Sequence, residues 1–138
     1  GKKKYLITHT TYDVVDVEKN FIQKRMARDL DYKDLLNSCD IGLSTVIIVR
    51  KLLTKNLFPN LKTKEDYVLW LKIAKKGIIF NGLDKTFTKW TNRPGSLSKS
   101  VYQKLKDAFV VYNKFERLNF FVSLTRVMIL SLNFIKKR

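Results

Sequence analysis

Two adjacent carboxylates, Glu65 and Asp66, stand where a helix is expected to begin, and they are the residues of this sequence best suited to acid–base chemistry. Apolar residues repeat at helical spacing over 67–74, Thr63 has the side chain of an N-cap, and Gly77 predicts the helix end. The helix dipole keeps first-turn acids ionised. A carboxylate held there can serve as a base, whereas the alternative is that both acids only cap the helix.

The acidic pair belongs to four short segments that occur in a defined order: LSTVIIVRK at 43–51, Phe58-Pro59, the helix just described, and RPGSLS at 93–98. This order and spacing resemble the C-terminal half of the family 2 glycosyltransferases, which are inverting enzymes of the GT-A fold. The resemblance extends from about Tyr5 to the C-terminal helices. It implies an enzyme that moves a sugar from a nucleotide-sugar donor to a glycan or a lipid-linked acceptor, as in surface polysaccharide synthesis.

The resemblance also implies roles for individual side chains. Asp66 would be the base that takes the proton of the acceptor hydroxyl, and Glu65 would orient it or bind an acceptor hydroxyl. Trp70, one turn further along the helix, would offer its ring to a sugar, although a tryptophan at that spacing is also typical of a core. Ser44 and Thr45 would take part in acceptor binding.

The loop at 93–98 resembles the mobile segment that lies near the donor diphosphate in the family. Arg93 would help to neutralise charge on the leaving group, and Ser96 would belong to the same substrate site. The family often has a Tyr-Arg pair slightly earlier, where this sequence reads Trp90-Thr91. The alternative is that the Pro-Gly dipeptide of this loop only forms a turn.

Asp29-Leu30-Asp31 matches the Asp-X-Asp metal-binding motif of GT-A enzymes in residue type. Its position differs, however, because the family motif precedes the strand that corresponds to residues 5–12 of this sequence. Asp31 is instead expected to cap a helix that begins at Tyr32, and no metal ligand is assigned in this chain. The resemblance implies that a divalent metal, Mg²⁺ or Mn²⁺, is held mainly by an upstream half that also binds the donor. We therefore expect this chain alone not to transfer sugar.

The elements that position these residues alternate between strands and helices, so the expected fold class is α/β. The pattern predicts a strand at 5–12 that extends to 16, a turn near 18–20 and a return strand from 21. Further expectations are a helix at 31–38, a buried strand at 44–49, a helical turn at 51–55, strands at 78–80 and 85–91 with a turn at 84, and helices after 98. Residues 1–100 would form half of a GT-A-like domain, a mixed sheet flanked by helices, and 101–138 a C-terminal helical extension.

Basic residues outnumber acidic ones by 28 to 12, which gives a formal net charge of +16. Lys supplies 21 of the 28, whereas bidentate recognition of phosphate or guanine favours Arg. A Lys-rich excess suits diffuse attraction to an anionic membrane or a nucleic acid, or it reflects compositional bias alone. A basic membrane-surface or nucleic-acid-binding module without catalysis is thus the alternative function. The sequence contains no recognition helix or paired aromatic stacking sheet that would favour nucleic acid.

The segment 118–135 is strongly apolar and is followed by a basic cluster. It predicts either an amphipathic helix in a membrane interface or a helix packed on the core. Cys39 is the single cysteine, which excludes an intramolecular disulfide, and His9 is the single histidine and is expected to be partly exposed on its strand. No signal peptide is visible, and the expected location is cytoplasmic, including the cytoplasmic face of a membrane.

Overall fold

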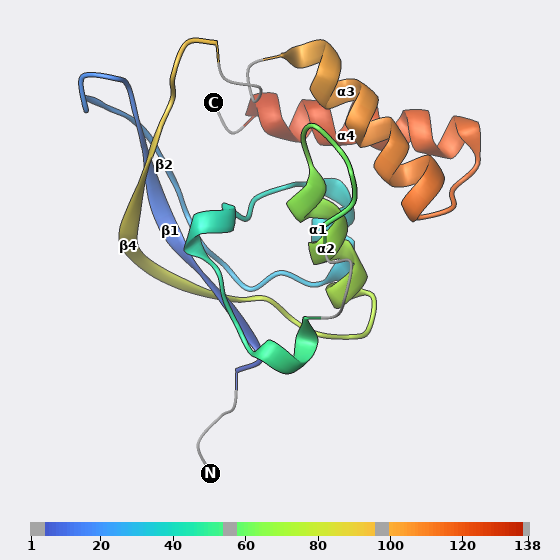
Figure 1. Ribbon diagram of the computed structural model, residues 1–138, viewed down its shortest axis with the longest axis horizontal. Helices are drawn as coiled ribbons and strands as arrows, with labels where there is room; N and C mark the ends of the chain where they lie inside the picture. The colour runs from blue at the N-terminus through green and yellow to red at the C-terminus, as the bar shows by residue number, and fades with distance from the viewer. Residues whose placement is uncertain (1–4, 54–57, 96–99, 137–138) are drawn as a thin grey trace.

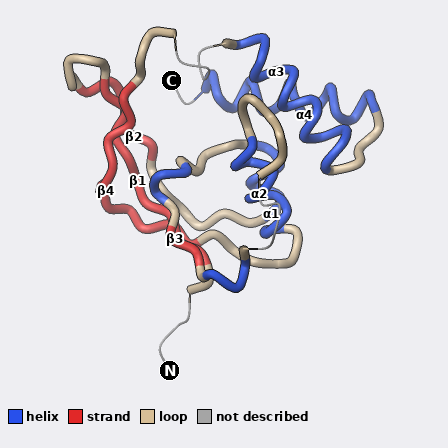
Figure 2. The backbone as a smooth tube through the Cα atoms, in the orientation of Figure 1, coloured by secondary structure: helices blue, strands red, loops and turns tan. Residues whose placement is uncertain are grey.

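The computed structural model describes residues 5–53, 58–95 and 100–136. A sheet forms one side of the molecule and the helices lie on the other (Figure 1; Figure 2). The strands are β1 (Ile7–Val15), β2 (Phe21–Arg25), β3 (Ile47–Ile48) and β4 (Asn81–Thr91). The helices are α1 (Tyr32–Asn37), α2 (Glu65–Ala74), α3 (Val101–Val110) and α4 (Phe120–Lys136), with 3-10 turns at Leu43–Thr45 and Arg50–Leu52 and a π-helical turn at Val111–Phe115.

β1 is the central strand of a four-stranded mixed sheet. It pairs antiparallel with β2 and β3 and parallel with β4. The turn from β1 to β2 is held by Asp16, whose Oδ1 accepts hydrogen bonds from the backbone N of Glu18 and of Asn20, both at 2.9 Å. The mixed sheet with helices beside it confirms the α/β class, and the turn and the return strand from Phe21 are where the sequence predicts them.

The segment 44–49 is not the single buried strand that its β-branched residues suggest. It consists of a 3-10 turn followed by the two-residue strand β3, and Ile47 is 73% exposed. The amide and the hydroxyl of Thr45 both donate to the carbonyl of Gly42, at 2.9 and 2.7 Å, and these local bonds fold the chain into a turn where a strand would otherwise continue.

The prediction of a turn at Asp84 is also wrong, because β4 continues through this position as one long strand. The pairing of β4 with β1 shifts register between Thr10 and Thr11, which makes an irregularity beside Asp84. The Asp84 carboxylate accepts a hydrogen bond of 2.8 Å from Thr11 Oγ1. Phe80, expected in a separate strand, forms an isolated bridge with Leu30 instead.

Helix α2 is the centre of the core, and seven of its ten residues are buried. The hydroxyl of Tyr67 donates to Leu35 O at 2.5 Å and lies 3.0 Å from the Tyr112 hydroxyl, which donates to Leu36 O at 2.8 Å. These bonds link α2 to α1 and to the π-helical turn after α3. Gly77 follows the helix end with a φ of +79°, as its position in the sequence predicts.

The C-terminal helices α3 and α4 lie side by side at the end of the molecule away from the sheet (Figure 1). α4 is fastened to α1 through Asn37, which accepts hydrogen bonds from Arg126 Nη1 at 2.7 Å and from Asn133 Nδ2 at 2.8 Å. Across the described residues, none of the helices has the length and apolar composition needed to cross a membrane.

Candidate active site

The start of α2 is set by a long-range contact and not by a local cap. Thr63, which the sequence predicts as the N-cap, donates from its backbone N at 2.8 Å and from its hydroxyl at 2.7 Å to Asp107 Oδ2 on α3. Lys64 is the N-cap residue instead, with a left-handed φ of 65° and no side-chain cap bond. Glu65 and Asp66 therefore begin α2 at a point that is anchored to α3.

We expect Asp107→Ala to loosen this anchor, because Asp107 is only 4% exposed and accepts both bonds from Thr63. Loss of the carboxylate removes the charged acceptor of both donors of the half-buried Thr63, which costs about 1–3 kcal/mol of unfolding free energy. Urea denaturation followed by far-UV circular dichroism measures this loss. Lys106→Ala, at an exposed position on the same helix, is the control, and equal stability of the two variants would show that Asp107 is not an anchor.

The surroundings of Asp66 raise the pKa of its carboxyl. Its side chain is half-buried, and burial raises the pKa of its carboxyl above the ordinary value of 3.8. A hydrogen bond of 2.8 Å from Tyr67 N to Asp66 Oδ1 opposes this shift, while the charge of Glu65 adds to it. The helix dipole alone would favour the ionised form, but desolvation outweighs it here. The structure thus gives Asp66 the character of a carboxylate that accepts a proton more readily than an exposed one.

Tyr12 of β1 lies within electrostatic range of Asp66, of Arg25 on β2 and of Asp40 in the loop after α1. The pKa of the Tyr12 hydroxyl is raised, mainly by burial, with further contributions from the charges of Asp40 and Asp66 and an opposing one from Arg25. A Cβ atom on Gly42 would lie 3.1 Å from Tyr12 Cε1, so the glycine lets the ring lie against the loop backbone. Tyr12 therefore experiences the charge of Asp66 and that of Asp40 at the same time.

Tyr12 and Asp40 are absent from the set of site residues that the sequence indicates. Tyr12 belongs to an alternating strand and Asp40 to a polar loop, and neither position carries a local motif. The signal that could have identified them is topological. A parallel pairing of β1 with β4 places β1 in the middle of the sheet, and this pairing joins segments about seventy residues apart.

The two hydroxyl residues predicted for the acceptor site differ in their exposure. Ser44 is exposed at the surface of the 3-10 turn, in a position that a ligand can reach. Thr45 is buried, and its hydroxyl is already used in the bond to Gly42. Thr45 therefore shapes the turn, while the role of Ser44 in acceptor binding stays a prediction.

The structure corrects the substrate-binding role considered for Trp70. Its side chain is 2% exposed and packs edge-on against Phe80, with ring centroids 5.6 Å apart, so its face is not available to a sugar ring. The core alternative therefore applies to Trp70. Arg93 is exposed just beyond the end of β4, where the structure does not bring it into contact with Asp66, and Ser96 lies outside the described residues.

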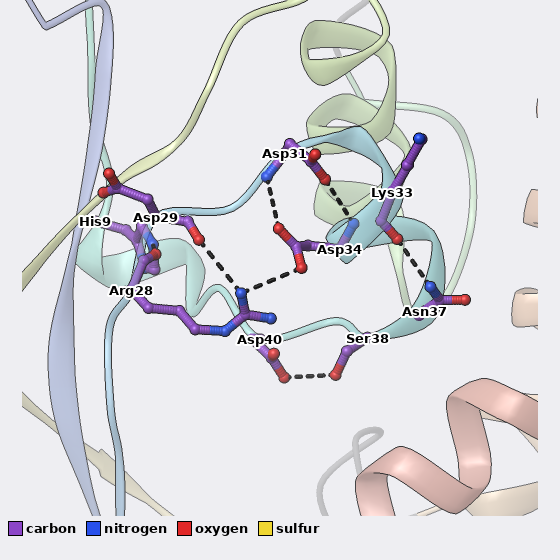
Figure 3. Close-up of polar contacts among 9 residues, drawn as sticks. All are labelled: His9, Arg28, Asp29, Asp31, Lys33, Asp34, Asn37, Ser38 and Asp40. Carbon is purple, nitrogen blue, oxygen red and sulfur yellow. Dashed lines mark hydrogen bonds and ion pairs between the residues drawn. The ribbon is translucent and has the colours of Figure 1, made fainter.

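Figure 3 shows the polar contacts around the Asp-Leu-Asp sequence that resembles a metal motif. Asp31 is the N-cap of α1, as predicted, and forms a capping box in which Asp31 Oδ1 accepts from Asp34 N at 2.8 Å and Asp34 Oδ2 accepts from Asp31 N at 3.1 Å. Asp29 Oδ1 accepts a bond of 2.9 Å from Gly82 N. Within 5–53, 58–95 and 100–136, the His, Cys, Asp and Glu side chains form no group of three or more that could hold a metal ion.

His9 is not partly exposed as its strand position suggests. It is 2% exposed, and its Nε2 lies 2.9 Å from the carbonyl oxygen of Arg28. Burial is the main cause that lowers the pKa of the imidazole below 6.5, so His9 is a neutral structural residue at physiological pH. It ties β1 to the segment that leads into α1 (Figure 3).

Several curated proteins are similar in sequence to this chain. No family model matches the sequence. Over 109 residues the chain is 30% identical to a "putative teichuronic acid biosynthesis glycosyltransferase", TuaG, of Bacillus subtilis, an alignment that covers 79% of this chain and 43% of TuaG. Two Escherichia coli proteins named "UDP-Glc:alpha-D-GlcNAc-diphosphoundecaprenol beta-1,3-glucosyltransferase" are also similar. WfaP is 32% identical over 69% of this chain and 39% of its own length, and WfgD is 30% identical over 83% and 45%.

The chain spans less than half the length of these curated relatives, whereas they match most of the chain. The named relatives are all glycosyltransferases, and the mixed α/β architecture agrees with part of such a domain. The chain is therefore a homologue of bacterial glycosyltransferases that corresponds to a part of them.

Proposed function

We propose that this chain is the acceptor-binding and catalytic-base half of an inverting glycosyltransferase of family 2, with the GT-A fold. In this proposal the complete enzyme moves a sugar from a nucleotide-sugar donor to a glycan or lipid-linked acceptor during surface polysaccharide synthesis. The observation that carries it is the half-buried Asp66 at the start of α2, whose pKa is raised, in a chain homologous to glycosyltransferases. The names of WfaP and WfgD, which give UDP-Glc as donor and a diphosphoundecaprenol-linked sugar as acceptor, support these classes of substrate.

The proposed reaction assigns one step to Asp66. Its carboxylate removes the proton of the acceptor hydroxyl as the acceptor oxygen forms a bond to the anomeric carbon of the donor sugar. The bond between that carbon and the donor diphosphate breaks on the opposite face, and the nucleoside diphosphate leaves with the electron pair. Glu65 orients Asp66 or binds the acceptor, Ser44 contacts the acceptor from the 3-10 turn, and Arg93 helps to offset the charge of the leaving group.

A divalent metal, Mg²⁺ or Mn²⁺, is part of the proposal for the complete enzyme. The described residues of this chain do not fit such an ion, because Asp29 and Asp31 are committed to backbone hydrogen bonds and no cluster of three potential ligands is present among them. The proposal therefore places the metal ligands, like most of the donor site, in the part of the enzyme that this chain does not include.

A lipid-linked acceptor would place the reaction at a membrane surface. A nucleotide-sugar donor is a cytoplasmic metabolite, so the proposal puts the enzyme on the cytoplasmic face of the membrane. The net charge of +16 supports this location, because lysine-rich surfaces are attracted to the anionic lipids of that leaflet. The nucleic-acid alternative is less favoured, because Lys and not Arg supplies most of the basic residues.

The test uses the longer polypeptide that contains this segment, with a divalent metal, a panel of nucleotide sugars and a diphosphate-lipid-linked sugar as acceptor. The proposal predicts that release of the nucleoside diphosphate from one donor depends on the acceptor, and that the product lipid gains one sugar by mass spectrometry. Release from every donor at the rate of a no-enzyme blank would contradict it. The 138-residue chain alone serves as the control and is expected to be inactive.

A further inference from the structure

Helix α4 carries an apolar stripe that faces away from the rest of the fold. Its buried residues, Ser123, Val127 and Leu130, mark the side that packs inward. On the opposite side, large apolar residues recur at helical spacing and are exposed: Phe121 (78%), Leu124, Met128, Leu132 and Ile135. Single exposed apolar residues are common on protein surfaces, but a contiguous exposed stripe usually marks an interaction site. This side of α4 is therefore expected to bind a partner.

The stripe continues onto α3 across an open groove. Leu105 and Phe109 of α3 and Leu124, Met128 and Leu132 of α4 line this groove, whose volume is about 570 Å³. Phe109 also packs against Phe120, with ring centroids 5.4 Å apart, and so fixes the two helices relative to each other at one end. The α3–α4 face, defined by these groove residues together with Phe121 and Ile135, is therefore a surface made by both helices.

The exposed charged side chains of the described segment 101–136 are all basic. The segment 101–138 contains eight Lys and Arg residues and two acids, Asp107 and Glu116. Both acids are turned inward: Asp107 is 4% exposed and bonded to Thr63, and the Glu116 side chain is 6% exposed and ion-paired with Lys75 at 3.0 Å. Neither carboxylate can therefore offset the exposed cations.

Exposed lysines stand beside the apolar stripe. Lys106 follows Tyr102 by one turn on α3, and Lys136 follows Leu132 by one turn on α4; all four are exposed. Helical residues four apart share a face, so each lysine can extend along the apolar surface while its ammonium remains in a polar layer. Apolar side chains bordered by lysines, without an exposed acid, are complementary to the acyl boundary and the phosphates of an anionic lipid bilayer.

We infer that the α3–α4 face is the surface through which this protein binds an anionic lipid bilayer, with Phe121, Met128 and Leu132 in the interface. The same electrostatics disfavours a second copy of the chain as the occupant, because two like faces would bring their lysines together. The bonds from Thr63 to Asp107 join this face to the start of α2. Contact with the bilayer would then hold Asp66 near the head group of a lipid-linked acceptor. This last consequence, unlike the binding itself, rests on the proposed function.

The test is co-sedimentation of the 138-residue chain with vesicles of phosphatidylcholine alone or mixed with phosphatidylglycerol. The expected result is binding to the anionic vesicles that weakens with salt. The double variant Phe121→Ser/Met128→Ser should bind at least about tenfold more weakly, because two large apolar side chains leave the interface. Lys106→Glu and Lys136→Glu should each weaken binding by about fivefold or more, from the contribution of one lysine near an anionic surface.

Matched controls are available on β4, where Phe87 is 71% exposed and Lys85 is exposed. Phe87→Ser and Lys85→Glu should leave vesicle binding unchanged, and circular dichroism should show every variant folded, since all these positions are exposed. Absence of binding by the wild type, or an equal loss in the β4 variants, would overturn the inference. So would dimerisation in gel filtration that the double variant abolishes, because it would identify a second copy as the occupant. The assay contains no sugar donor, so its outcome is independent of whether Asp66 is a base.

Discussion

Asp66→Asn is expected to lower kcat of the complete glycosyltransferase by about 10²–10⁴-fold, the range that a general base contributes. The amide cannot accept the proton of the acceptor hydroxyl, whereas its Oδ1 can still accept the 2.8 Å hydrogen bond from Tyr67 N. The start of α2 should therefore keep its structure, and KM for the donor should change little. Steady-state release of the nucleoside diphosphate at neutral pH measures the effect.

Stability distinguishes this loss of chemistry from a loss of fold. Because burial raises the folded-state pKa of Asp66, its contribution to stability is greatest at low pH and is lost as the pH rises through that pKa. The neutral asparagine avoids the cost of a buried charge, so thermal melting of Asp66→Asn at pH 7 should occur at the wild-type temperature or above. Asp16→Asn, in the exposed β1–β2 turn, is the control and should keep wild-type kcat. A variant at Asp66 that melts early would assign the residue a structural role instead.

Gly82→Ala is expected to destabilise the sheet strongly. A Cβ atom at this position would lie 2.4 Å from the backbone N and C of Arg28 and 2.5 Å from its Cα. The neighbour is backbone and cannot rotate away, so β4 and the segment before α1 must separate. This movement would also strain the bond from Gly82 N to Asp29. Overpacking of this kind costs about 3 kcal/mol of unfolding free energy, measured by urea denaturation.

Gly77→Ala provides the comparison, because a Cβ there meets nothing within 4 Å but the φ of +79° remains unfavourable for alanine. That substitution should cost about 1 kcal/mol. Similar losses at the two glycines would indicate that the close approach of β4 to Arg28 does not contribute to stability.

The features that the sequence predicts correctly are those with local causes. Asp31 caps α1 because its own side chain reaches the amide three residues later, and Gly77 ends α2 because it tolerates a left-handed backbone. The β1–β2 hairpin follows from alternation and from the turn residues around Asp16. In each case the determining contacts lie within a few residues of chain.

The predictions that differ from the structure depend on contacts between distant segments. Thr63 has the chemistry of an N-cap, but the carboxylate of Asp107, 44 residues away, takes both of its donors. The spacing of Trp70 in the sequence fits either a core residue or a residue that stacks against a sugar ring. Its packing against Phe80 shows that it is a core residue. Asp66 itself is visible in the sequence, but its raised pKa depends on the burial that the packed fold imposes.

The account of Asp66 as the base is tested most directly by the pH dependence of kcat/KM for the acceptor, measured on the complete enzyme as wild type and as Asp66→Asn. The account predicts that wild-type activity falls on the acid side with an apparent pKa above the ordinary aspartate value of 3.8, because the protonated carboxyl cannot accept a proton. In Asp66→Asn the rate should be lower by about 10²-fold or more and this acid limb should disappear. A variant that retains both the rate and the acid limb would show that the base lies elsewhere.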